Sequence, residues 1–109
     1  MKVLKINNKD CVLKFTTKSI MNLNAKGITL TTLTEDMEKL NLLNLYDAFH
    51  EGLKFANNNI TLDETYELID AYYEEGGEME DFFTMILEEY AKSMGLGANF
   101  KEIMKQQQD

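Results

Sequence analysis

The fold is decided by residues 61–94, which read TLDETYELIDAYYEEGGEMEDFFTMILEEYAKSM. Apolar residues recur at helical spacing on both sides of Gly76–Gly77, so the stretch predicts two amphipathic helices. Thr61 is of a residue type that caps helix N-termini, and acids occupy the face opposite the apolar side chains. The two stripes suit an antiparallel helix pair. Its central core is expected to contain Tyr66, Ile69, Phe82, Phe83 and Ile86, with Met79 and Met94 also buried.

A β-hairpin is predicted upstream, over residues 1–16. Its two strand-like runs flank the turn residues Asn7–Asp10. Because alternate residues of a strand share a face, Cys11, Leu13 and Phe15 are expected to pack on the helices, unless the alternate face does so.

Three more helices are predicted between this hairpin and Thr61, over residues 17–26, 34–40 and 42–56, the second with Thr34 as its N-cap. The fold class is therefore α+β: an N-terminal β-hairpin followed by four or five amphipathic helices, mostly helical. We expect one domain over residues 1–95 and a weakly structured C-terminal tail over residues 96–109.

The composition limits the classes of protein to which this chain can belong. The chain has 109 residues, 44% of them hydrophobic and 28% charged, which is typical of one globular domain. Its single cysteine excludes an internal disulfide framework. We find neither a signal-peptide pattern nor an apolar run of about 18 residues. We therefore expect no membrane span and a cytoplasmic location.

Charge is distributed unevenly along the chain. Residues 31–90 contain sixteen acids and two lysines, whereas residues 1–30 contain six lysines and one acid, within a net charge of −8. Such an acidic middle repels phosphate backbones, so we expect no nucleic-acid partner.

No residue pattern predicts catalysis. His50 and Cys11 are the only histidine and the only cysteine, which excludes His-based metal clusters and gives neither residue an evident catalytic partner. The acidic run over residues 74–81 lacks the spacing of a calcium loop. We therefore expect a non-enzymatic protein without cofactor or metal.

Three apolar residues depart from the buried stripes of their helices: Leu43, Phe55 and Met85. Each could fill the core from another direction, or lie in an exposed patch that binds a partner. Phe100 and Ile103, which form with Met104 a last weak amphipathic segment, are weaker candidates for partner binding.

The order in which these sequence features follow one another along the chain is also informative. A lysine-rich hairpin over Lys2–Phe15 precedes Gly27-Ile28-Thr29, the run LYDAFHEGLK over residues 45–54, and LDETYELID, which begins at residue 62 and leads to Glu74-Glu75-Gly76-Gly77. Over roughly residues 1–95 this pattern resembles the tail assembly chaperones of long-tailed bacteriophages and related prophages.

The resemblance implies a non-enzymatic protein that works in the cytoplasm of the host bacterium. Members of that family bind the tape measure protein, keep it soluble, help tail tube subunits polymerise around it, and leave before the virion matures. In many members a frameshifted C-terminal extension recruits the tail tube protein. The family defines no binding motif, so the resemblance assigns no site residue.

An alternative is a small acidic helical interaction or inhibitor protein, either an adaptor or a mimic of nucleic acid. Its support is the charge of residues 31–90, although a solvated helical face also carries such acids. The sequence leaves the oligomeric state open, and a homo-oligomer is compatible with it.

Overall fold

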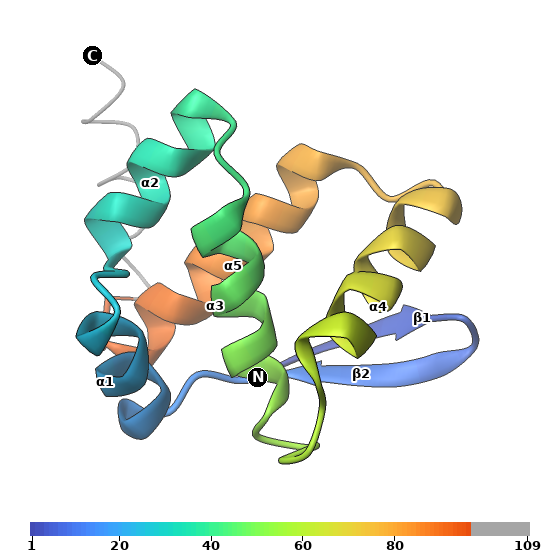
Figure 1. Ribbon diagram of the computed structural model, residues 1–109, viewed down its shortest axis with the longest axis horizontal. Coiled ribbons are helices and arrows are strands. Elements are labelled where there is room, and N and C mark those ends of the chain that lie inside the picture. The colour runs from blue at the N-terminus through green and yellow to red at the C-terminus, as the bar shows by residue number, and fades with distance from the viewer. Residues whose placement is uncertain (97–109) are drawn as a thin grey trace.

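The structure is a computed structural model that describes residues 1–96. In this part of the chain a two-stranded antiparallel hairpin is followed by five helices (Figure 1). The predicted α+β class is confirmed. The strands are β1 (Lys2–Ile6) and β2 (Lys9–Leu13), and the helices are α1 (Thr17–Ala25), α2 (Leu30–Lys39), α3 (Leu43–Leu53), α4 (Leu62–Glu74) and α5 (Met79–Ser93).

The hairpin turns through two asparagines in the left-handed region, with φ of 53° at Asn7 and 61° at Asn8. Two left-handed residues form the tight turn that suits strand twist, and asparagine tolerates this conformation. Two hydrogen bonds donated by backbone N–H groups then fix the hairpin: Asn7 N donates to a side-chain carboxylate oxygen of Glu75 (2.7 Å), and Lys14 N donates to the carbonyl of Gly52 (3.1 Å). These bonds therefore connect the hairpin to α3 and to the C-terminal end of α4.

The start of α2 differs from the prediction. Thr29, and not Thr34, caps the helix: Thr29 Oγ1 accepts a hydrogen bond from Thr32 N, and Thr32 Oγ1 accepts one from Thr29 N. Thr34 lies inside the helix, where its hydroxyl donates to the carbonyl of Leu30 (2.8 Å). The prediction was wrong because the reciprocal cap uses a second threonine where glutamate or glutamine is the usual signal.

The core is built around α5, which packs against α2 and α3. Aromatic rings connect the elements: Phe49 of α3 lies 4.8 Å from Phe82 of α5, between ring centroids, and Phe15 lies 5.5 Å from Tyr90. The predicted core residues Ile69, Phe82, Phe83 and Ile86 are all buried, as are Leu13 and Phe15 of the predicted hairpin face, while Cys11 is partly buried against the same core.

Three residues expected in the core are exposed. Tyr66 is 37% exposed because α4 turns a neighbouring stripe inward, in which Thr65 and Ile69 are buried. Thr65 satisfies its hydroxyl by donating to the carbonyl of Thr61 (2.9 Å). Met79 and Met94 lie at the two ends of α5 and are also exposed.

The predicted antiparallel pair is replaced by a different arrangement. The main helical neighbour of α4 is α3, and α4 also contacts β1. It contacts α5 through ring contacts close to the Gly76–Gly77 turn, where Tyr72 and Tyr73 both pack against Phe82. In Figure 1, α4 and the hairpin form one side of the molecule and α1, α2 and α5 the other.

Candidate functional site

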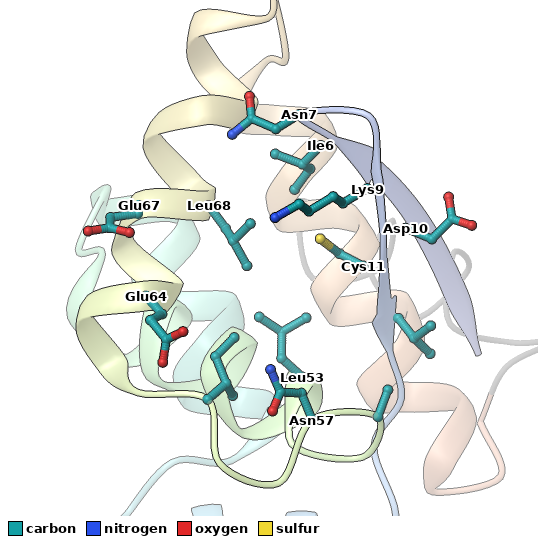
Figure 2. Close-up of a pocket in the computed structure, with 13 residues that line it drawn as sticks. Ile6, Asn7, Lys9, Asp10, Cys11, Leu53, Asn57, Glu64, Glu67 and Leu68 are labelled. Carbon is teal, nitrogen blue, oxygen red and sulfur yellow. The ribbon is translucent and has the colours of Figure 1, made fainter.

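A pocket of 440 Å³ opens between the hairpin and α4 (Figure 2). Ile6 and Cys11 enter it from the inner face of the hairpin, where β2 runs opposite β1. Leu68 enters it from α4 and Leu53 from the C-terminal end of α3 (Figure 2), and Ile60, in the chain between α3 and α4, also lines it. Because Cys11 and Leu68 are only partly buried, the pocket offers solvent an apolar wall.

The rim of this pocket is charged. Lys9 extends its ammonium group across the pocket from β2, and Glu64 lies on the pocket side of α4, whereas the carboxylates of Glu67 and Asp10 point away from the pocket (Figure 2). Within residues 1–96, no ion pair joins Lys9 to any of these carboxylates. Of these charged side chains, Lys9 and Glu64 are therefore the two that face the pocket.

Glu64 has a fixed carboxylate. Its Oε1 accepts a hydrogen bond from Thr61 N (3.0 Å), while Glu64 N donates to Thr61 Oγ1 (3.0 Å). The hydrogen bonds from the backbone and side chain of Thr61 lower the pKa of Glu64, so this carboxylate stays ionised at neutral pH.

The outer face of α4 is acidic. Asp63, Glu67, Asp70 and Glu74 are all exposed. The ion pairs of the described residues involve other acids: Glu89 pairs with the N-terminal amine and Lys92, and Glu51 pairs with Lys54. Within the described part of the chain, these four acids of α4 therefore form no ion pair.

Neither reactive side chain that the sequence offers is set up for chemistry. Burial raises the pKa of the Cys11 thiol, and the negative charge of Asp10 raises it further, so the thiol stays protonated at neutral pH. His50 Nε2 donates to the carbonyl of Ile60 (2.8 Å), which ties α3 to the start of α4. Among residues 1–96, no group of three or more His, Cys, Asp or Glu side chains could hold a metal ion.

The structure does not bring the sequence-predicted partner-binding residues together. Leu43 is 64% and Phe55 51% exposed, but Leu43 is the first residue of α3 and Phe55 follows its C-terminal end, so the length of this 11-residue helix, about 15 Å at the usual rise per residue, separates them. The ammonium group of Lys14 covers the Phe55 ring, 4.7 Å from its centroid.

Met85 is buried, so its interpretation as an exposed residue is wrong. Because both α2 and α3 pack on α5, a residue outside the main apolar stripe is buried as well. Phe100 and Ile103 lie outside the described residues.

Sequence reasoning missed the pocket itself. Cys11 packs against the core, as expected for its strand face, and Leu68 of α4 does so as well. No local pattern shows that α4 and the hairpin diverge at this point, since the divergence follows from how each packs on α3.

Comparison with known proteins decides the family. Residues 3–106 match the sequence model of a family described as "Phage tail assembly chaperone protein, TAC". The chain belongs to this family. The resemblance noted in the sequence is thereby confirmed, and the match continues past residue 95 into the segment set apart above as a tail.

No curated protein and no solved structure compared with this chaperone gave a match. None of its helices within the described residues is both long and apolar enough to cross a membrane.

Proposed function

We propose that this chaperone binds the tape measure protein of its own phage, keeps it soluble and assists polymerisation of the tail tube around it. The observation that carries the proposal is the family match over residues 3–106. The role is non-enzymatic, which fits a protonated Cys11 and a His50 engaged in a structural hydrogen bond.

The surface suits a client that is long, apolar and prone to aggregation. Flexible, polarizable methionine side chains adapt to varied partners, and several of the exposed apolar residues are methionines. The net charge of −8 would keep a complex with such a client soluble. The exposed large apolar side chains of the described residues are Met1, Val3, Met21, Leu40, Leu43, Phe55, Tyr66, Met79 and Met94.

The place of action follows from the proposed role. The chaperone acts in the cytoplasm of the host bacterium and is absent from the mature virion. A longer, frameshifted product would recruit the tail tube protein through its extension. Leu43 and Phe55 remain candidates for client contact, as do Phe100 and Ile103.

Co-expression with the tape measure protein tests the proposal. We expect the tape measure protein to stay soluble only when the chaperone is present, and the complex to be recovered at both ~0.05 M and ~0.5 M salt, because screening weakens charge contacts but not apolar ones. Leu43→Asp and Phe55→Asp test whether those two side chains contribute. An insoluble tape measure protein, with no complex at either salt concentration, would contradict the proposal.

A second candidate function is favoured by the unpaired acids of α4: an acidic inhibitor that mimics nucleic acid. Such a protein would bind a basic enzyme, and its affinity would fall steeply between the same two salt concentrations. The pull-down therefore separates the two functions.

A further inference from the structure

We propose that a groove beside Phe55 is the docking site for the acidic outer face of α4 of a second copy of the chaperone. The copies meet head to tail, because each carries one groove and one acidic face. The inference goes beyond the proposed function, since it concerns the chaperone without its client.

The groove beside Phe55 is separate from the pocket between the hairpin and α4. It has a volume of 280 Å³ and lies between α1 and the end of α3. Lys18 lines it from α1, Glu51 lines it from α3, and Lys54 and Phe55 line it from the chain that follows. Because the Phe55 ring is half-exposed, the groove presents an aromatic surface to solvent.

Positive charge surrounds Phe55. The Lys14 ammonium group lies 4.7 Å from the centroid of the Phe55 ring, and Lys18 is exposed at the groove. Neither lysine forms an ion pair within residues 1–96. Glu51, the acid in the groove lining, is already paired with Lys54 (3.2 Å). The unpaired charge at the groove is therefore positive, which favours an acidic partner.

The chain itself carries a surface of the required chemistry on the outer face of α4. Tyr66 lies on this face, since it is three residues from Asp63 and four from Asp70, and it is 37% exposed. The acids of the face are exposed and form no ion pair within the described residues: Asp63, Glu67, Asp70 and Glu74. The face thus combines unpaired negative charge with an aromatic ring, and the groove combines unpaired positive charge with another.

The contact must form between two copies. Within one chain, α4 packs against α3 and β1, and Figure 1 shows α1 and α4 on different sides of the molecule. A chain therefore cannot bring its own α4 face to its own groove. Between copies, Tyr66 packs on Phe55, and the nearby lysines contact the ring and the carboxylates of α4. Each pair leaves one groove and one face unused, so further copies can add.

Sedimentation of the full chain over a range of concentrations tests the inference. We expect the average mass to rise with concentration at ~0.05 M salt and to rise much less at ~0.5 M salt, because salt screens contacts between exposed charges. An average mass that stays at that of one chain at every concentration in ~0.05 M salt would overturn the inference.

Two double variants reverse the charge of one surface each. The groove variant carries Lys14→Glu and Lys18→Glu, and the face variant carries Asp70→Lys and Glu74→Lys. Reversing one exposed charge should weaken association about fivefold, so each double variant should weaken it about twentyfold. Association as strong as that of the natural chain in either variant would overturn the inference.

Combining the two sets of substitutions in one chain is the decisive step. This chain has the net charge of the natural chain and carries the complementary charges in exchanged positions, so we expect association to return. Recovery would also show that the groove variant loses association and not its fold. As the matched control, the groove variant carries Glu35→Lys and Glu38→Lys, at two exposed positions of α2. The control should not recover, and equal recovery in both chains would overturn the inference.

The client is the other occupant that the experiment must distinguish. If the natural chain stays monomeric while the groove variant loses the tape measure protein in the pull-down, the groove binds the client and the inference is wrong. If the chaperone associates as described but forms no complex with the tape measure protein, the inference stands and the proposed function is wrong.

Discussion

The two sides of α3 differ in how completely the apolar residues that pack there are buried. On one side α5 packs against α2 and α3, and its Phe82 and Phe83 are 0% and 1% exposed. On the other side α4 and the hairpin diverge, and Leu68 and Cys11 line an open pocket. Both sides arise from similar amphipathic patterns. The comparison teaches that the covering elements, and not the apolar stripes, determine whether an apolar face becomes core or lines an open pocket.

Phe83→Ala should have the largest effect on stability. The substitution leaves a cavity on the sealed side, and we expect the free energy of unfolding to fall by about 3–5 kcal/mol in denaturant melts. Leu68→Ala, at the open pocket, should cost much less, because water already reaches that side chain. A loss under about 1 kcal/mol for Phe83→Ala would break the comparison, since such a loss falls far below the usual range for a buried aromatic side chain.

Gly52→Ala should come next, because Gly52 lies at the seam between α3 and the hairpin. A Cβ atom there would overlap Leu13 Cδ1 and approach the Phe15 ring to 3.1 Å. We expect a loss of about 1–3 kcal/mol from overpacking. Gly27→Ala meets no atom within 4 Å, although its φ of 81° adds backbone strain. If the Gly52→Ala variant is as stable as the natural chain, α3 and the hairpin do not pack tightly at this position.

Thr61→Ala should cost about 1 kcal/mol, the usual cost of removing an N-cap. It removes the Oγ1 acceptor for Glu64 N at the start of α4. Thermal melts of Thr61→Ser, which retains the hydroxyl, provide the control. If the alanine and serine variants melt at the same temperature, the hydroxyl of Thr61 contributes nothing to stability.

The smallest effect concerns the pH dependence of stability. Burial alone would raise the pKa of Glu51, but hydrogen bonds from Asn22 (2.9 Å) and Lys54 (3.2 Å) outweigh it and lower the pKa. Because the folded pKa lies below the unfolded value of about 4.3, Glu51 stabilises the fold above that value and loses this contribution as pH falls. Urea melts between about pH 5 and pH 3 should show a smaller decline for Glu51→Gln than for the natural chain. An equal decline would contradict the pKa shift.

Much of the fold was predictable because periodicity and caps are local. The hairpin, the helix that begins after Thr61 and the buried Phe82, Phe83 and Ile86 all follow from spacing. The errors have tertiary causes. Burial of Thr65 rotates α4 and exposes Tyr66, and a second covering helix buries Met85.

The pocket could not be predicted, since it depends on the angle between two elements that are far apart in sequence. Its lining residues come from the hairpin, the end of α3, the chain that follows α3, and α4. Only the negative charge of α4 was evident from the sequence.

Hydrogen–deuterium exchange of the chaperone, alone and bound to the tape measure protein, tests the central claim most directly. The account predicts slower exchange on binding in β2 and α4, which flank the pocket, and unchanged exchange in α2 on the sealed side. New protection confined to α1 and α2, with β2 and α4 unchanged in a stable complex, would contradict it.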